Sequence, residues 1–238
     1  MQINNKKQEI VSIEDIQYSR FAIKTHVVSS EDDLMDVIQK YVPKNYEEGD
    51  MLFISEKMVA CTQNRAIPIK DIKPRKLATL LSKFVMKTPS GIGLGMPETM
   101  EMAFRECGTA RILFASFVSM LGKIIRKRGL FYKVAGEKAR GIDGPCKNTL
   151  PPYNKYVVLI PNNPQKICQT ISDKFNINAT IIDCNDLGID ILGVSDNDTY
   201  DKELLCKILK DNPLGQSKEQ TPMGIIRKFH EVQQRKAQ

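Results

Sequence analysis

The chain reads, at the point that decides its fold, Gly49-Asp50-Met51-Leu52-Phe53-Ile54-Ser55-Glu56-Lys57. A Gly-Asp turn leads into the short apolar run Met51–Ser55, which is typical of a strand buried on both faces. A hydroxyl, an acid and the ammonium of Lys57 then follow at the end of this strand. In one interpretation they form an ordinary polar strand end. In the other, Lys57 pairs with a phosphate as a point charge.

A second apolar run ends in acids, at Thr180-Ile181-Ile182-Asp183-Cys184-Asn185-Asp186-Leu187-Gly188. Asn-Asp before a glycine is an ordinary turn signal. Hard cations such as Mg²⁺, however, often take one or two carboxylates, with water and substrate phosphates completing the shell. Asp143 lies between two glycines, where a backbone can approach a ligand closely, although a turn aspartate has the same surroundings. Asp143 with Asp183 or Asp186 would supply a carboxylate pair for a metal.

Strands and helices interleave along the chain, and no internal repeat is detectable. The apolar patterns predict strands at 21–28, 51–55, 112–117, 130–135, 156–160, 179–183 and 189–194. Capping residues and apolar stripes predict helices at 30–41, 76–87, 97–107, 164–175 and 201–210. The fold class is therefore α/β or α+β, with mixed sheets and flanking helices.

The predicted organisation has three parts. Residues 1–20 form a polar leader, residues 21–224 form the main domain, and residues 225–238 form a basic tail that frays. A segment rich in Gly and Pro at 141–152 marks a junction between two lobes or an active-site loop. The beginning of the chain lacks the apolar segment of a secretory signal, so the sequence predicts a cytoplasmic protein without a membrane partner.

Composition excludes several kinds of site. Six dispersed cysteines without a C-x-x-C pair, and two histidines far apart, argue against a zinc ribbon, a disulfide framework and a Ser-His or Cys-His nucleophile. Gly91–Gly95 follows a helical pattern, which argues against a dinucleotide-binding loop. A net charge of +7 predicts a polyanionic partner, either nucleic acid or a phosphate-bearing small molecule. The cationic run Lys123–Arg128 is a solvated face, a phosphate cradle or a nucleic-acid contact.

Four motifs together resemble one family, the coenzyme F-420 gamma-glutamyl ligases, in a divergent, bacterial-type form. They are the block Gly49–Ala60, Gln63-Asn64-Arg65 after it, Pro161-Asn162-Asn163-Pro164 before a helix, and Asp183–Gly188. The family joins L-glutamate to a small-molecule acceptor, a deazaflavin precursor, and uses GTP with Mg²⁺ or Mn²⁺. The resemblance thus implies an amide-forming ligase with a two-lobed fold that binds GTP or GDP and forms a homodimer.

The resemblance also implies roles for residues. The metal ligands would be Asp143, Asp183, Asn185 and Asp186, since the family's Asp-Thr pair falls on Asn185 and Asp186. The catalytic residues would be Lys57 and Asp183, and the nucleotide would contact Ser55, Lys57, Arg65 and Gly188. The sequence departs from the family where Asp-Thr is replaced and where the segment after Gly188 is shortened.

Two alternatives stay open at this point. One is a ligase of the same family that acts on a different acceptor. The other is a non-catalytic protein of the same fold that binds a nucleotide or a nucleic acid, which the altered metal motif and the basic segments favour.

Overall fold

The computed structural model describes residues 7–85, 93–124, 126–127, 129–185, 188–215 and 218–229. The chain divides into two compact units. Unit 1 contains residues 1–63 and 161–238, and unit 2 contains residues 64–160. The chain therefore passes between units at 63–64 and 160–161, whereas the sequence pattern places the lobe junction at 141–152.

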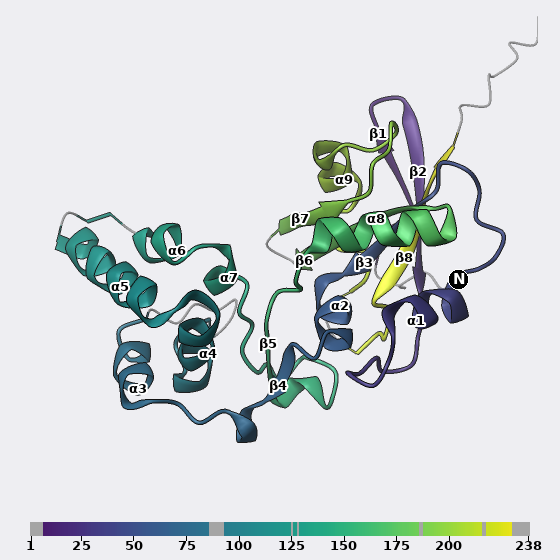
Figure 1. Ribbon diagram of the computed structural model, residues 1–238. Coiled ribbons are helices and arrows are strands. Elements are labelled where there is room, and N and C mark those ends of the chain that lie inside the picture. The colour runs from purple at the N-terminus through teal and green to yellow at the C-terminus, as the bar shows by residue number, and fades with distance from the viewer. Residues whose placement is uncertain are drawn as a thin grey trace, which may run out of the picture. The chain divides into compact units, whose positions relative to one another are not determined.

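Unit 1 is built on a six-stranded mixed sheet (Figure 1). Its strands are β1 (Ile10–Ile13), β2 (Ile16–Ile23), β3 (Met51–Ser55), β6 (Asn178–Asn185), β7 (Gly188–Val194) and β8 (Met223–Phe229). In the order β1-β2-β8-β3-β6-β7, β3 and β6 are parallel and the other neighbours are antiparallel. This mixed sheet with flanking helices confirms the predicted fold class.

Both faces of this sheet are covered by apolar packing. The helices of unit 1 are α1 (Leu34–Tyr41), α2 (Glu56–Thr62), α8 (Pro164–Phe175) and α9 (Lys202–Ile208). Leu52 and Ile54 of β3 pack in a cluster with α1, α2 and α8. Met51 and Phe53 pack in a second cluster with α9, because successive side chains of a strand point to opposite faces. All four side chains are fully buried, as the apolar run predicts.

The helices of unit 1 begin near the predicted residues. Asp201 caps α9 and accepts a hydrogen bond from the backbone N–H of Leu204, and Pro164 opens α8. The sequence predicts a helix from residue 30, but α1 begins at Leu34 and is capped by Asp33. The Asp33 Oδ1 accepts hydrogen bonds from the backbone N–H groups of Met35 and Asp36, which is the usual role of a cap carboxylate.

Unit 2 is mainly helical. Its helices are α3 (Lys76–Ser82), α4 (Pro97–Cys107), α5 (Thr109–Ile124), α6 (Leu130–Ala135) and α7 (Glu137–Arg140), with 3₁₀ turns at Ile69–Asp71 and Tyr153–Lys155. A short antiparallel pair joins β4 (Ala66–Pro68) to β5 (Tyr156–Val158). These elements enclose a core of their own, in which Met100 and Phe104 of α4 are among the most deeply buried side chains.

Two predicted strands of unit 2 are helical. Residues 112–117 lie in α5 and residues 130–135 form α6. An apolar run that has no polar face looks the same in a buried strand and in a buried helix. Here Ile112 and Ala115, three residues apart, are both buried, which is the spacing of one helical face.

The ends of the chain also differ from the expected leader and tail. Residues 10–23 form the hairpin β1–β2, and the expected tail begins inside β8, between β2 and β3. Arg227 of β8 holds Asp50 through Nε at 2.9 Å and Nη2 at 2.7 Å. One of the positive charges that indicated a tail, that of Arg227, thus belongs to an ion pair in unit 1. Residues 230–238 lie outside the described residues.

No helix within the described residues is long and apolar enough to cross a membrane. Of the Gly91–Gly95 segment, residues 91 and 92 lie outside the described residues. Gly93 has a φ of 49°, in the region that favours glycine, and α4 begins four residues later at Pro97.

Candidate functional site

The carboxyl ends of β3 and β6 lie side by side because these strands are parallel neighbours (Figure 1). Ser55, the last residue of β3, is the Cα partner of Ile182, and Asp183 follows Ile182 on β6. The polar groups after β3 and the carboxylate on β6 therefore meet at one edge of the sheet. In open α/β sheets, ligands bind beyond this edge.

Ser55 fixes the chain at this edge. It is the N-cap of α2, and its Oγ accepts a hydrogen bond from the backbone N–H of Lys57 at 3.3 Å. Its own N–H donates to the carbonyl of Pro222 at 2.8 Å. These bonds hold the first turn of α2, from which the exposed side chain of Lys57 extends. The direct change from strand to helix puts Lys57 two residues after the end of β3, the strand that pairs with β6.

Asp183 has a second carboxylate opposite it. In the antiparallel pair β6–β7, Asp183 and Asp190 are Cα partners, so their side chains project from the same face. Asp183 is half-buried and Asp190 is exposed. Like charges directly opposite each other destabilise a sheet, and a bound cation would remove this repulsion. Sequence reasoning missed Asp190, because only the register of the hairpin puts it beside Asp183.

The Cys184 thiol is next to Asp183, and its pKa is affected by this negative charge. Burial raises the pKa of Cys184 to about 12, and the carboxylates of Asp183 and Asp211 add to the rise. The thiol stays protonated and donates a hydrogen bond to the carbonyl of Leu209 at 3.4 Å. Cys184 is therefore a packing residue, and the oxygens of Asp183 and Asp190 are the better donors for a hard cation.

A groove of about 330 Å³ lies elsewhere in unit 1. It is lined by the beginnings of α1 and α8, by the end of α2 and by Lys166. Across it, Gln63 donates to the carbonyl of Asn162 at 3.1 Å and accepts from the N–H of Asn162 at 2.7 Å. Asn163 is the N-cap residue of α8, but its side chain makes no hydrogen bond to the helix. The first backbone N–H groups of α8 are therefore left to other partners. Such a helix end favours anions.

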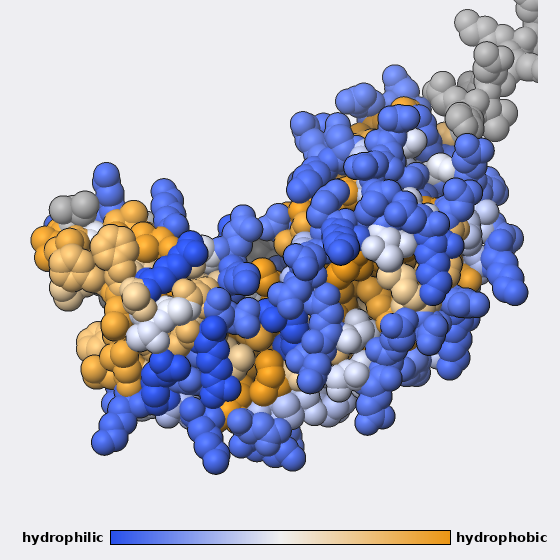
Figure 2. Space-filling model, viewed as in Figure 1, coloured by the Kyte–Doolittle hydropathy of each residue, from blue (hydrophilic) through white to orange (hydrophobic). Residues whose placement is uncertain are grey.

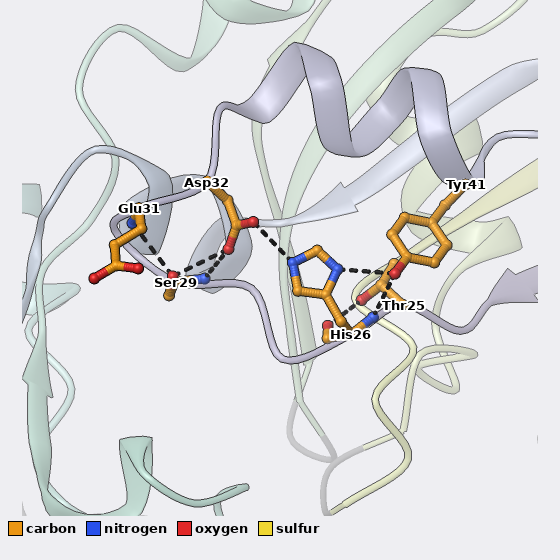
Figure 3. A network of polar contacts seen from close by, with 6 residues as sticks. All are labelled: Thr25, His26, Ser29, Glu31, Asp32 and Tyr41. Atoms are coloured by element: carbon orange, nitrogen blue, oxygen red, sulfur yellow. Dashed lines mark hydrogen bonds and ion pairs between the residues drawn. The ribbon is translucent and has the colours of Figure 1, made fainter.

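A hydrogen-bonded network around His26 precedes α1, which forms one wall of this groove (Figure 3). The His26 Nε2 lies 2.8 Å from Asp32 Oδ1, and Nδ1 lies 2.9 Å from the Tyr41 hydroxyl. Burial alone would raise the pKa of Asp32. Hydrogen bonds from Ser29 and His26 outweigh it and hold this pKa below its usual value. No motif in the sequence indicates this network, which joins the loop to the last residue of α1.

Residues 22–183 match the model of a family described as F420-0:Gamma-glutamyl ligase. The match covers more than half of the chain and runs from the end of β2 to Asp183 on β6. The chain belongs to this family. The resemblance seen in the sequence motifs is thereby confirmed. A comparison with curated proteins found no match.

Two of the family-like motifs touch each other. The Gln63 segment and the Pro161–Pro164 segment are joined by the two hydrogen bonds between Gln63 and Asn162, across 99 positions of sequence. Gly193 of β7 explains how closely α8 approaches the sheet. A Cβ at Gly193 would lie 2.6 Å from the carbonyl carbon of Pro164, so only glycine lets the helix pack here.

Asp143 and Arg65, the other residues predicted for metal and nucleotide, belong to unit 2. Asp143 is half-buried, and its backbone exchanges two hydrogen bonds of 2.9 Å with Val158. Arg65 donates from Nε to the carbonyl of Ile160 at 2.6 Å and pairs with the Glu106 carboxylate. The Arg65 guanidinium thus contacts groups of its own unit. A role for it in nucleotide binding stays a prediction.

The remaining predicted residues lie in the β6–β7 turn, beyond the end of the family match. Asn185 ends β6 as the partner of Gly188, which begins β7. Nothing is described of the Asn185 side chain, and Asp186 lies outside the described residues. A Cβ at Gly188 would meet no described atom within 4 Å, so close packing does not require glycine there.

The donor set fits a cation that keeps part of its water shell. Within the described residues, no three His, Cys, Asp or Glu side chains are grouped to hold a metal ion. Mg²⁺ commonly takes only one or two carboxylates and fills its shell with water and substrate phosphates. Asp183 and Asp190 offer two carboxylates on one face of the hairpin. The edge of the sheet therefore suits Mg²⁺ or Mn²⁺ bound together with a phosphate.

Proposed function

We propose that the chain is a metal- and nucleotide-dependent ligase that joins L-glutamate to a small-molecule acceptor through an amide bond, with GTP as the source of the activating phosphate. Its membership of the F420-0:Gamma-glutamyl ligase family supports the reaction class. The observation that carries the proposal is the parallel pairing of β3 and β6, which places Lys57 and Asp183 at one edge of the sheet. The family resemblance further implies a homodimer.

The proposed reaction has two steps. A carboxylate of the acceptor first attacks the terminal phosphorus of GTP, which forms an acyl phosphate and releases GDP. The amino group of glutamate then attacks the acyl carbon, the amide bond forms, and phosphate leaves with the pair of electrons of the C–O bond. Phosphoryl transfer of this kind depends mainly on positioning and on neutralisation of charge.

The residues at the sheet edge suit these requirements. The Lys57 ammonium would pair with a phosphate oxygen as a point charge, and the cap by Ser55 fixes the turn that carries it. Asp183 and Asp190 would hold the divalent cation, and Asn185 and Asp186 in the adjoining turn are further candidates. When bound, the cation would neutralise charge on the phosphates.

Calorimetric titration tests this proposal. The full chain, with Mn²⁺ present, is titrated with GDP, and the Lys57→Met variant is compared with the Lys210→Met variant. Lys210 is exposed in the turn just after α9 and serves as the matched control. Lys57→Met should weaken GDP binding by roughly 10- to 100-fold, since losing a charge-assisted contact costs about 1.5–3 kcal/mol, and the control should bind as the parent does. Absence of binding at millimolar nucleotide would reject the nucleotide-dependent ligase.

A second candidate is a nucleotide or nucleic-acid binding protein that has lost the reaction. The cationic run Lys123–Arg128 and the replaced Asp-Thr pair favour it. Binding to RNA through backbone phosphates would fall steeply as salt rises, because each neutralised phosphate releases counterions. RNA binding with a steep salt dependence and without sequence preference would favour this second function. Binding of GDP that changes little with salt would favour the ligase.

A further inference from the structure

His26 lies at the sheet edge that carries the proposed site. Strands β2 and β3 both pair antiparallel with β8, so they run in the same direction and end at the same edge. Met223 of β8 is the Cα partner of Ile23 on β2 and of Ile54 on β3. His26 follows Ile23 by three residues, as Lys57 follows Ile54. Since neighbouring strands lie about 4.8 Å apart, the two chains leave the sheet roughly 10 Å from each other.

The segment before β8 holds both chains at this edge. The N–H of Thr25 donates to the carbonyl of Gln220 at 3.0 Å, and the N–H of Ser55 donates to the carbonyl of Pro222 at 2.8 Å. The Thr25 hydroxyl donates to the carbonyl of His26 at 2.7 Å. The backbone that carries the imidazole is therefore fixed to the same segment as the end of β3.

Hydrogen bonds determine which nitrogen of His26 carries the proton (Figure 3). The pKa of Asp32 lies below its usual value, so Asp32 is a carboxylate at neutral pH, and its Oδ1 accepts from Nε2 at 2.8 Å. A neutral imidazole has one N–H, so Nδ1 has the free lone pair, and the Tyr41 hydroxyl donates to it at 2.9 Å. The Tyr41 oxygen also accepts from the backbone N–H of His26 at 3.2 Å. A carboxylate that orients an imidazole in this way is a common arrangement in general bases.

We infer that Tyr41, backed by His26 and Asp32, removes a proton from the ammonium group of L-glutamate before the second step of the proposed reaction. This role rests on the proposed function, which needs a base because an ammonium nitrogen has no lone pair with which to attack. The proton passes from the ammonium nitrogen to the Tyr41 oxygen, while the Tyr41 O–H proton passes to Nδ1. The imidazolium that forms pairs with the Asp32 carboxylate and returns its proton to water after turnover. The freed amine attacks the acyl carbon, and its second proton leaves with the phosphate.

The surroundings of the imidazole suit a carrier of protons. The titratable groups that face it are Asp32 from its own loop and Tyr41 from α1, whose ring centroid lies 5.5 Å from that of His26. The Lys40 ammonium lies 5.2 Å from the centroid of the Tyr41 ring. The side chains of His26 and Asp32 are 37% and 25% exposed, so the network is open to solvent. Hydrophilic side chains cover much of unit 1 in Figure 2, which suits a substrate that carries charges.

The two steps of the proposed reaction can be measured separately. Hydroxylamine in place of L-glutamate captures the acyl phosphate as a hydroxamate, and it is already a neutral nucleophile at neutral pH. The full chain, with GTP, Mg²⁺ and the deazaflavin precursor, is assayed for the hydroxamate and, in parallel, for the amide. Tyr41→Phe and His26→Gln should retain hydroxamate formation but lose roughly 100-fold or more in amide formation, since general acid–base catalysis contributes about 10²–10⁴-fold. Amide formation should recover as the pH rises through the pKa of the glutamate ammonium, because the free amine then needs no base.

Tyr46→Phe is the matched control, because Tyr46 is another half-buried tyrosine of unit 1, and its hydroxyl donates to the carbonyl of Phe175. The control should form both products as the parent does. Amide formation at the parent's rate in both variants at neutral pH would overturn the inference. Equal loss of hydroxamate and amide would overturn it as well, because such a loss indicates a structural role. A parent chain that forms neither product would reject the proposed function, and this role with it.

Discussion

Replacing Asp50 by Ala should destabilise unit 1 strongly, because this carboxylate joins β3 to β8. The Asp50 residue is 2% exposed. Its oxygens accept hydrogen bonds from Arg227 Nε at 2.9 Å, from Arg227 Nη2 at 2.7 Å and from the backbone N–H of Glu47 at 2.8 Å. The Asp50 hydrogen bond also raises the pKa of Arg227, against the effect of burial.

The expected magnitude follows from what the substitution leaves behind. Removing one partner of a buried ion pair costs about 3–5 kcal/mol, because the other charge stays buried without compensation. The Arg227 side chain is 23% exposed and keeps Glu47 at 2.6 Å, so part of its charge remains solvated or paired. We therefore expect a loss near the lower limit, about 3 kcal/mol in the free energy of unfolding.

Urea unfolding, followed by circular dichroism, measures this loss. The chain has no Trp, so tyrosine fluorescence provides the second signal. Two units can unfold separately, and hydrogen exchange of the β3 and β8 amides assigns the loss to unit 1.

The matched control is Glu47→Ala, which removes an ion pair with the same arginine from a side chain that is 67% exposed. An exposed pair of this kind contributes about 0.2–1 kcal/mol. If Asp50→Ala cost no more than Glu47→Ala, the ion pair would not hold β8 to β3, and the reasoning would be refuted.

Three further outcomes are expected. Gly193→Ala should lower the free energy of unfolding by roughly 1–3 kcal/mol, because the added Cβ would lie 2.6 Å from the Pro164 backbone. The control Gly188→Ala should change the free energy of unfolding by less than about 0.5 kcal/mol. Equal losses for the two variants in urea unfolding would contradict the close approach of α8 to the sheet. Asp32 has a lowered pKa when folded, so its stabilisation is present above the unfolded pKa of about 3.9 and is lost as pH falls through the lower folded value. Melting temperatures should therefore fall more steeply in the parent than in Asp32→Asn as the pH falls below about 4, and parallel curves would contradict this assignment. Asp190→Asn should weaken Mn²⁺ affinity at least as much as loss of an outer-shell partner does, roughly tenfold, and calorimetry that found unchanged affinity would remove Asp190 from the metal site.

Three of the six strands of the unit 1 sheet, β3, β6 and β7, were predictable from local pattern, whereas β1 and most of β8 lay in the expected leader and tail. The run Met51–Ser55 is apolar at four successive positions and is buried on both faces, as such a run predicts. The segment Ile112–Phe117 has the same apolar character but is helical. Its neighbours decide the outcome, because the apolar pattern continues to Ile124 at helical spacing, a length that suits a helix better than a strand.

Long-range pairing explains what local pattern missed. The basic residues after Ile225 suggested a tail, but Arg227 is the ion-pair partner of Asp50, 177 positions earlier in the sequence. In the same way, Asp190 carries no signal of its own. It becomes a candidate metal ligand only through the register of β6 and β7, which makes it the partner of Asp183. Contacts between residues that lie far apart in the sequence depend on how all the strands of the sheet pair, and no single segment determines them.

The most direct test of the proposed reaction is mass spectrometry of its product. The full chain is incubated with GTP, Mg²⁺ or Mn²⁺, L-glutamate and the deazaflavin acceptor of the family, and parallel samples contain other small carboxylate acceptors. We predict an acceptor that gains one glutamyl residue, with GDP and phosphate formed in equal amounts, and loss of this product in Asp183→Asn. An acceptor that stays unmodified in every sample, while the folded chain still binds GDP and metal, would contradict the assignment as a ligase.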